Sequence, residues 1–170
     1  MSSSASLLSS KSHSFCQALI SPPSPTTLIS KYFTPSSPKI TEHGPKWCRD
    51  RLPFLAKTFT GTSGPDSCET YFELLSKTLK MHMHEKSFPS QRGFIVDADA
   101  TTEEKGGGKG VVCVVGNAEF ESVKTGKKWR EKFMYRLSGF DEEGRIGHWE
   151  IWSDPLSAWD AVGPEKDNKH

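Results

Sequence analysis

The order of secondary-structure signals along the 170 residues constrains the fold more than any other feature of the sequence. Apolar residues at helical spacing mark residues 12–20, 26–33 and 64–82 in the first half. The third segment is the clearest helix, because it opens with Gly-Pro-Asp and carries acidic residues early and lysines late. Its apolar residues share one face: Tyr71, Leu74, Leu75 and Leu79. We therefore predict a mainly helical first half.

Strand-like segments separated by polar turns fill the second half of the chain. They cover residues 84–100, 110–123, 125–144 and 145–152. A short strand is also expected where "KITEH" follows the second helical segment. Helices followed by a run of antiparallel strands predict an α+β fold.

The length and the distribution of apolar residues predict one domain. Residues 1–11 are rich in serine and lack apolar periodicity, so we expect them to be disordered. We expect the domain to span residues 12–163, and residues 164–170 to form a solvated tail.

Composition excludes several classes of protein. The 22 basic and 21 acidic residues are interspersed, so a nucleic-acid footprint is not expected. No apolar run approaches the ~20 residues of a membrane helix, and we expect a soluble, cytoplasmic protein without a membrane partner. The cysteines lie far apart and form no C-x-x-C pair, which favours free thiols: Cys16, Cys48, Cys68 and Cys113.

A metal site is the weakest of the chemical possibilities. His82 and His84 have strand spacing and would lie on one face. Because no third ligand is nearby in the sequence, we predict neither a metal nor another cofactor.

The most specific signal is the last hairpin, "FDEEGRIGHWEIWSDP", with Gly144 at its turn and Trp149 on its second strand. This pattern resembles the nuclear transport factor 2-like superfamily, which includes SnoaL-like polyketide cyclases, ketosteroid isomerases and limonene epoxide hydrolases. The resemblance covers residues 14–162. It implies a cone-shaped, curved antiparallel sheet wrapped around N-terminal helices, with a pocket inside the cone.

Family catalytic positions transfer only in part. The resemblance places His43 where ketosteroid isomerases have their base, and an imidazole could serve as one. Their oxyanion-binding tyrosine and acid correspond to Phe15 and Arg136, and the aspartate of the epoxide hydrolases corresponds to Ile151. Neither catalytic set is intact, which implies a different use of the pocket.

Alternation along the last two strands assigns their faces. Placed on the family hairpin, the last strand turns Trp149 and Ile151 into the pocket. Its outward residues are then His148, Glu150 and Trp152. The preceding strand is predicted to point Met134, Arg136 and Ser138 inward, and Phe133, Tyr135 and Leu137 outward. A slip of one residue would instead make His148, Glu150 and Trp152 the pocket residues.

Two functional hypotheses follow from the resemblance. The first is a cofactor-independent cyclase, isomerase or dehydratase that acts on a small apolar carbonyl metabolite. In it, His43 moves a proton, Arg136 stabilises negative charge, and the pocket is lined by Phe15, Trp47, Met134, Trp149 and Ile151. The alternative is a non-catalytic ligand-binding or dimerisation module of the same fold.

Bland interpretations compete with these roles. His43 could be a loop residue that makes a backbone hydrogen bond, and Arg136 could form an ion pair with Glu131 or Glu150 on a wet sheet. The apolar residues assigned to the outer sheet face predict a homodimer through that face: Phe133, Tyr135, Leu137 and Trp152.

Overall fold

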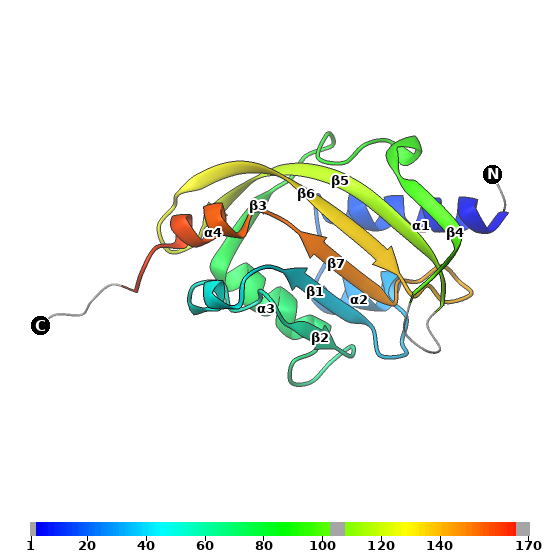
Figure 1. Cartoon of the computed structure of the whole chain (residues 1–170), viewed down its shortest axis with the longest axis horizontal. Helices are drawn as coiled ribbons and strands as arrows, with labels where there is room; N and C mark the ends of the chain where they lie inside the picture. The colour runs from blue at the N-terminus through cyan, green and yellow to red at the C-terminus, as the bar shows by residue number, and fades with distance from the viewer. Residues whose placement is uncertain (1–2, 103–107, 166–170) are drawn as a thin grey trace, which may run out of the picture.

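In the computed structural model, which describes residues 3–102 and 108–165, the strands of the chain form one curved sheet. Its seven strands within these ranges are β1 (Lys39–His43), β2 (Thr58–Thr60), β3 (Leu79–His82), β4 (Ile95–Thr101), β5 (Lys109–Ser122), β6 (Lys128–Ser138) and β7 (His148–Trp152). They lie in the order β2-β1-β7-β6-β5-β3, and β4 also pairs with β5 (Figure 1). The β1–β7 pair is parallel and the other pairs are antiparallel. This α+β arrangement confirms the predicted fold class.

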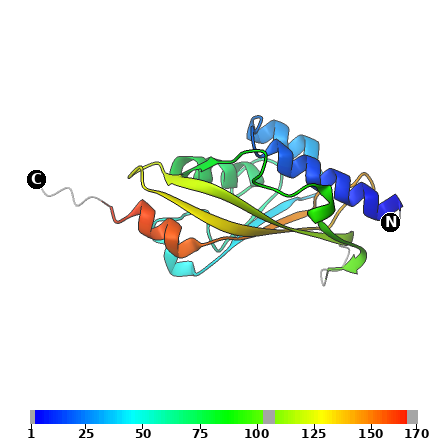
Figure 2. The same cartoon turned by 90° about the horizontal axis from the view of Figure 1, so that it is seen from above.

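Three helices lie together on one side of the sheet (Figure 2). They are α1 (Ser3–Ala18), α2 (Pro25–Tyr32) and α3 (Cys68–Thr78). The side of the sheet that they cover is called the inner face below, and the opposite side the outer face. A fourth helix, α4 (Pro155–Val162), lies at the end of the sheet near the β5–β6 turn, where Thr125 donates a hydrogen bond to the carbonyl of Ala161. Two short 3₁₀ helices, η1 (Lys46–Asp50) and η2 (Gln91–Gly93), complete the described elements.

The helix predicted over residues 64–82 is shorter in the structure. Ser67 and Thr70 form a capping box at its start, and α3 then ends at Thr78. Leu79 begins β3, which pairs with the far end of β5. The long β5 strand offers unpaired backbone groups there, so tertiary pairing ends the helix earlier than local propensity predicts.

The prediction of disorder over residues 1–11 is wrong for the part that the structure describes. Helix α1 begins at Ser3, and Leu8 is buried against Gly110 of β5. Leu8 belongs to one helical stripe with Ser12, Phe15 and Leu19, all buried. Packing of this stripe stabilises a serine-rich segment whose own helix propensity is low. Residues 1–2, and residues 166–170 of the predicted tail, lie outside the described ranges.

Aromatic side chains fill the space between the helices and the inner face. Trp149 of β7 stands at the centre and is 2% exposed. The centroids of five neighbouring rings lie 5.1–6.4 Å from that of Trp149: Phe15, Phe33, Tyr71, Phe72 and Tyr135. Each ring contributes a large apolar area, so this cluster is the main core of the cone.

The predicted faces of β6 are reversed in the structure. Tyr135 pairs with Ile151 and Leu137 with Trp149, and directly paired residues share a face of an antiparallel sheet. The inner face therefore holds the buried residues Phe133, Tyr135 and Leu137, while Met134 and Arg136 lie on the outer face. The apolar side of β6 faces the helices because burial there removes its side chains from water. The family placement is shifted by one residue on this strand and therefore predicts the opposite faces.

This reversal removes three of the four residues on which the predicted homodimer rests. What the outer face does expose is a row across β5, β6 and β7, formed by Val115, Met134 and Trp152, which are 56%, 37% and 37% exposed. The homodimer stays a prediction, and these residues would carry it.

Candidate active site inside the cone

A small cavity of about 30 Å³ lies between the inner face, α3 and the start of α4. Most of its lining is apolar, with a few polar groups that converge on it. The lining residues are Glu42, Tyr71, Leu75, Leu79, Met81, Phe120, Glu131, Phe133, Tyr135, Trp149, Ile151, Ser153 and Ala158. A cavity of this volume accommodates one or two water-sized groups.

The carboxyl group of Glu42 is the central polar group of this cavity. Glu42 is 8% exposed, and both of its oxygens accept hydrogen bonds. Tyr71 Oη donates to Oε2 at 2.8 Å, and Ser153 Oγ donates to Oε1 at 3.0 Å. Burial raises the pKa of Glu42, and the two hydrogen bonds oppose this shift only in part.

Three elements place these side chains together. Strand β1 turns Ile40 and Glu42 inward because it is paired on both sides, with β2 and β7. Tyr71 comes from the first turns of α3, and Ser153 directly follows β7. Local sequence could not reveal this meeting, since Glu42 and Ser153 are separated by 111 positions.

The remaining polar groups of the cavity are proton donors or a second acid. Trp149 Nε1 is buried and has no hydrogen-bond partner among the described residues. Burial, together with the neighbouring Glu42 carboxyl, raises the pKa of Tyr71 well above its ordinary value. Burial likewise raises the pKa of Tyr135. Both phenols therefore stay protonated at neutral pH and can donate hydrogen bonds.

Glu131 is the second carboxyl group in the lining. Burial raises its pKa to about 7, although it accepts a hydrogen bond from the backbone N–H of Asp154. In an apolar cavity, a buried carboxylate can remove a proton from carbon. Neutral hydrogen-bond donors and a second acid nearby can stabilise the negative charge that develops.

The structure places His43 outside the cone. Its side chain lies on the outer face and is 37% exposed, with the ring stacked on Trp152 at 4.3 Å between centroids. The predicted base is therefore the residue next to the buried acid, Glu42. Consecutive residues of a strand point to opposite faces, so Glu42 faces the cone and His43 faces outward. Ile40 carries the signal that could have found Glu42, since an apolar residue two positions earlier marks the inward side.

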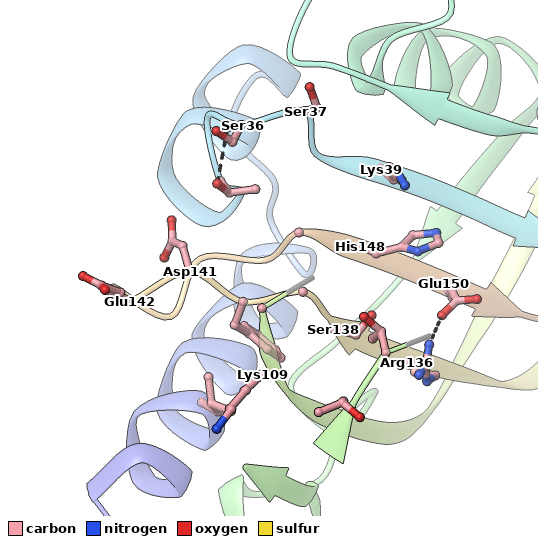
Figure 3. A pocket seen from close by; sticks show the side chains of 18 of the residues that line it. Ser36, Ser37, Lys39, Lys109, Arg136, Ser138, Asp141, Glu142, His148 and Glu150 are labelled. Atoms are coloured by element: carbon pink, nitrogen blue, oxygen red, sulfur yellow. Dashed lines mark hydrogen bonds and ion pairs between the residues drawn. The ribbon is translucent and has the colours of Figure 1, made fainter. Parts of the chain in front are cut away.

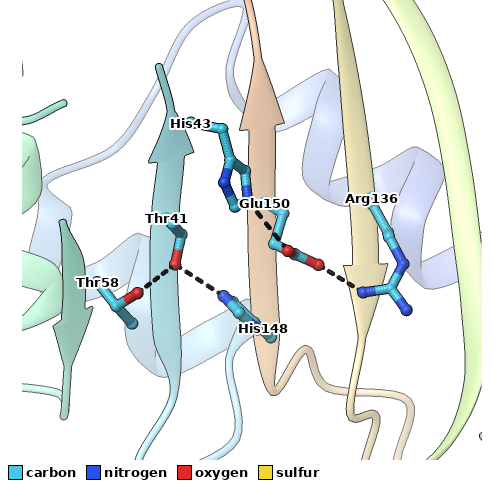
Figure 4. A network of polar contacts seen from close by, with 6 residues as sticks. All are labelled: Thr41, His43, Thr58, Arg136, His148 and Glu150. Atoms are coloured by element: carbon cyan, nitrogen blue, oxygen red, sulfur yellow. Dashed lines mark hydrogen bonds and ion pairs between the residues drawn. The ribbon is translucent and has the colours of Figure 1, made fainter. Parts of the chain in front are cut away.

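His43 and Arg136 instead belong to a polar network on the outer face (Figure 4). Glu150 Oε2 accepts from Arg136 at 2.5 Å, and Glu150 Oε1 lies 3.1 Å from His43 Nε2. Thr41 connects His148 and Thr58, at 2.9 and 2.8 Å. Burial raises the pKa of Glu150, but the hydrogen bonds from Arg136 and His43 outweigh burial and lower it overall. The ion pair expected in the bland interpretation of Arg136 is thus present.

An open hollow of about 1200 Å³ adjoins this network at the end of the sheet where residues 139–147 turn (Figure 3). Its lining mixes both signs of charge and includes Lys39, Lys109, Arg136, Asp141, Glu142, His148 and Glu150. The hollow and the cone lie on opposite faces of β6 and β7, so its residues take no part in the cavity.

The predicted pocket residues divide between cavity, core and surface. Trp149 and Ile151 line the cavity. Phe15 is fully buried and contacts Trp149 from behind, so it supports the lining without forming it. Trp47 is 57% exposed on η1 and contacts Trp159, because η1 lies at the surface beside α4. Met134 lies on the outer face for the reason given for β6. His148, Glu150 and Trp152 lie on the outer face as alternation predicts.

The remaining sequence candidates form no site. His82 Nε2 lies 2.8 Å from Glu121 Oε2, and within residues 3–102 and 108–165 no three His, Cys, Asp or Glu side chains are grouped to hold a metal ion. The four cysteines are free thiols. In the same part of the chain, no helix combines the length and apolar character needed to cross a membrane.

No protein-family model matches the sequence, and neither does any curated protein. Solved structures do match. A nuclear transport factor 2-like protein of Burkholderia xenovorans LB400 aligns with a TM-score of 0.63 and 11% identity, over 94% of this chain and 98% of the other. A protein of Xanthomonas campestris pv. campestris with the provisional name of polyketide cyclase aligns with a TM-score of 0.60 and 9% identity, over 95% of this chain and 100% of the other. TerC, co-crystallised with polyporic acid, aligns with a TM-score of 0.61 and 11% identity, over 92% of this chain and 98% of the other. The chain therefore has the nuclear transport factor 2-like fold, whose last hairpin its own sequence resembles.

Proposed function

We propose that the protein catalyses a proton-transfer reaction on a small carbonyl compound, as a cyclase, isomerase or dehydratase does, with Glu42 as the base. One observation carries the proposal. The Glu42 carboxyl is buried in an apolar cavity, is held by Tyr71 and Ser153, and shares that cavity with Trp149, whose N–H has no partner among the described residues. Buried groups of opposite function in one cavity are typical of acid–base sites.

Each group has a defined part in the reaction. Glu42 takes a proton from the carbon next to the carbonyl, so the C–H bond breaks and its electrons form the C=C bond of an enolate. The N–H of Trp149 is the donor available to the developing oxyanion. Tyr71 and Ser153 keep the Glu42 carboxyl in place. Return of the proton at another carbon completes an isomerisation. Transfer of the proton from Glu42 to a β-hydroxyl, whose C–O bond breaks as the enolate electrons form a new C=C bond, completes a dehydration and releases water.

The size of the cavity limits the substrate. A volume of about 30 Å³ is far below the roughly 300–1,000 Å³ of typical ligand sites. A substrate larger than a few atoms therefore requires the lining to move. Ala158 places α4 against the cavity, so displacement of this eight-residue helix is the simplest way to widen it.

The proposal is tested by proton exchange in D₂O, because abstraction from carbon introduces deuterium whatever the final product is. The wild-type protein is incubated with polyketide-like, terpenoid and steroid-like carbonyl compounds, and the incorporated deuterium is measured by mass spectrometry. Polyporic acid serves as a binding probe, since TerC of the same fold was co-crystallised with it.

Glu42→Gln is expected to reduce exchange by ~10²–10⁴-fold, because the amide keeps the shape of the side chain but does not accept the proton. Glu150→Gln is the matched control, since Glu150 lies on the neighbouring strand and the opposite face. Equal exchange by wild type and Glu42→Gln contradicts the proposal. Compounds that bind without any exchange favour the alternative, a non-catalytic ligand-binding module.

A further inference from the structure

Glu131 stands where the cone meets solvent. It lies on the inner face of β6, two residues before Phe133, and lines the cavity together with Glu42. The other titratable groups of the lining are buried, namely Glu42, Tyr71 and Tyr135. Glu131 is only partly buried. Among the described residues of the lining, it is thus the titratable group that reaches both the cavity and the solvent.

We propose that Glu131 is a proton-exchange residue, which passes the proton taken up by Glu42 from the cavity to the solvent. The inference rests on the proposed role of Glu42. After abstraction, the O–H bond of the Glu42 carboxylic acid breaks and an O–H bond forms on the Glu131 carboxylate, directly or through one water. Glu131 then releases the proton to solvent. A solvent proton that returns through Glu131 to Glu42 reprotonates the enolate carbon, so that both carboxylates are restored.

The surroundings of Glu131 suit this exchange. The titratable groups that share the cone cavity with it or contact it are Glu42 from β1, Tyr71 from α3, Tyr135 from β6 and Asp154 at the start of α4. Glu131 also lines a second, open hollow together with His82, His84, Glu119, Arg130 and Lys132. Burial is the main reason that its pKa rises to about 7; the backbone N–H of Asp154 lowers it, and the carboxylates of Asp154 and Glu42 raise it. A carboxyl group in this range accepts and releases protons with similar ease at neutral pH.

A structural role of Glu131 must be separated from proton exchange. Its carboxylate accepts the backbone N–H of Asp154, the N-cap residue of α4, and so fixes the start of that helix. Glutamine can accept the same hydrogen bond but does not titrate, whereas alanine does neither. Glu131→Gln therefore removes only the exchange, and Glu131→Ala removes both functions.

The experiment follows an isotopic label rather than the rate alone. Among the carbonyl compounds named above, the one whose C–H proton the wild-type protein exchanges fastest is deuterated at that carbon. It is then incubated with the protein in H₂O. The wild-type protein is expected to lose the label to water, and the loss should increase as the pH rises through about 7, where Glu131 becomes a carboxylate. Glu131→Gln should retain most of the label and lose this pH dependence. Its turnover should fall by less than the ~10²–10⁴-fold expected for loss of the base.

Glu119→Gln is the matched control, because Glu119 lies on the adjacent strand with its side chain on the outer face. It should lose the label as the wild-type protein does. A Glu131→Gln protein with the label loss and pH profile of the wild-type protein overturns the inference, even if Glu42→Gln is inactive. An effect seen only in Glu131→Ala also overturns it, since it assigns Glu131 to the anchoring of α4. Full activity of Glu42→Gln instead removes the proposed function itself.

Discussion

The two faces of the sheet carry glutamates on neighbouring strands in opposite electrostatic settings. Glu42 of β1 faces the cone and accepts hydrogen bonds from two neutral hydroxyl groups, those of Tyr71 and Ser153. Glu150 of β7 faces outward and lies against Arg136 and His43. Burial raises the pKa of both, but only the outer glutamate has a cation close enough to reverse the shift.

The difference shows what distinguishes a candidate base from a structural ion pair. A carboxyl group buried in an apolar cavity gains affinity for protons when neutral donors offset the effect of burial only in part, and it can take a proton from carbon. A carboxylate paired with a guanidinium loses that affinity and serves mainly to connect strands. Residue type alone therefore does not identify a candidate base; the face of the sheet on which the side chain lies must also be known.

The largest expected effect compares two tryptophans of β7. Trp149→Ala should destabilise the protein by about 3–5 kcal/mol, because Trp149 is buried among five aromatic rings. Trp152→Ala should cost less than about 1 kcal/mol, since Trp152 is 37% exposed on the outer face. Urea unfolding followed by circular dichroism measures both. Similar losses for the two variants would show that another molecule covers the outer face.

The sequence predicted the fold because its last hairpin and its order of elements are specific to it. It also predicted the faces of β7, where Trp149 and Ile151 alternate with polar residues. The faces of β6 were missed although Phe133, Tyr135 and Leu137 form an equally clear apolar alternation. On β6 the register taken from the family hairpin conflicts with the physical requirement that the apolar side of a strand faces the helices, and the physical requirement holds in the structure.

The candidate site was predicted less well than the fold. The resemblance places the candidate base at His43, whereas the acid that the structure buries in the cone is the preceding residue, Glu42. The partners of Glu42 depend on contacts between β1, α3 and the residue after β7, and such long-range contacts have no local signal. The first half of α1 has a weak sequence signal, because Leu8 is the only buried apolar residue before Phe15 in the described part of this helix.

The comparison of buried and exposed sides extends to α1, which covers the inner face. Leu8→Ala should destabilise the protein by about 2–3 kcal/mol, because Leu8 is 4% exposed and contacts Gly110 of β5. Leu7→Ala is the matched control and should cost less than about 1 kcal/mol, since Leu7 is 37% exposed. The same unfolding measurement tests both variants. Equally small losses of unfolding free energy in the two variants would contradict the packing of residues 3–11 on the sheet and support the disorder predicted from the sequence.

The smallest effect is a pair of opposite shifts in melting temperature for Glu42→Gln and Glu150→Gln. The folded pKa of Glu42 is raised above its ordinary value of 4.5, so between these two pKa values the folded protein keeps a proton that the unfolded chain has lost. Stability therefore falls as the pH rises through that window, and Glu42→Gln should melt higher than the wild-type protein at pH 7.

For Glu150 the sign is reversed, because its folded pKa lies below 4.5. Its contribution to stability is present above that value and is lost as the pH falls through the lowered pKa, so Glu150→Gln should melt lower at pH 7 and approach the wild-type protein in acid. Each kcal/mol corresponds to about 2–4 °C in a chain of this size, so scanning calorimetry from pH 3 to 8 resolves effects of a few degrees. A lower melting temperature for Glu42→Gln at pH 7 would mean that the folded protein gains from the ionised carboxylate, and that the two glutamates are held by the same kind of interaction after all.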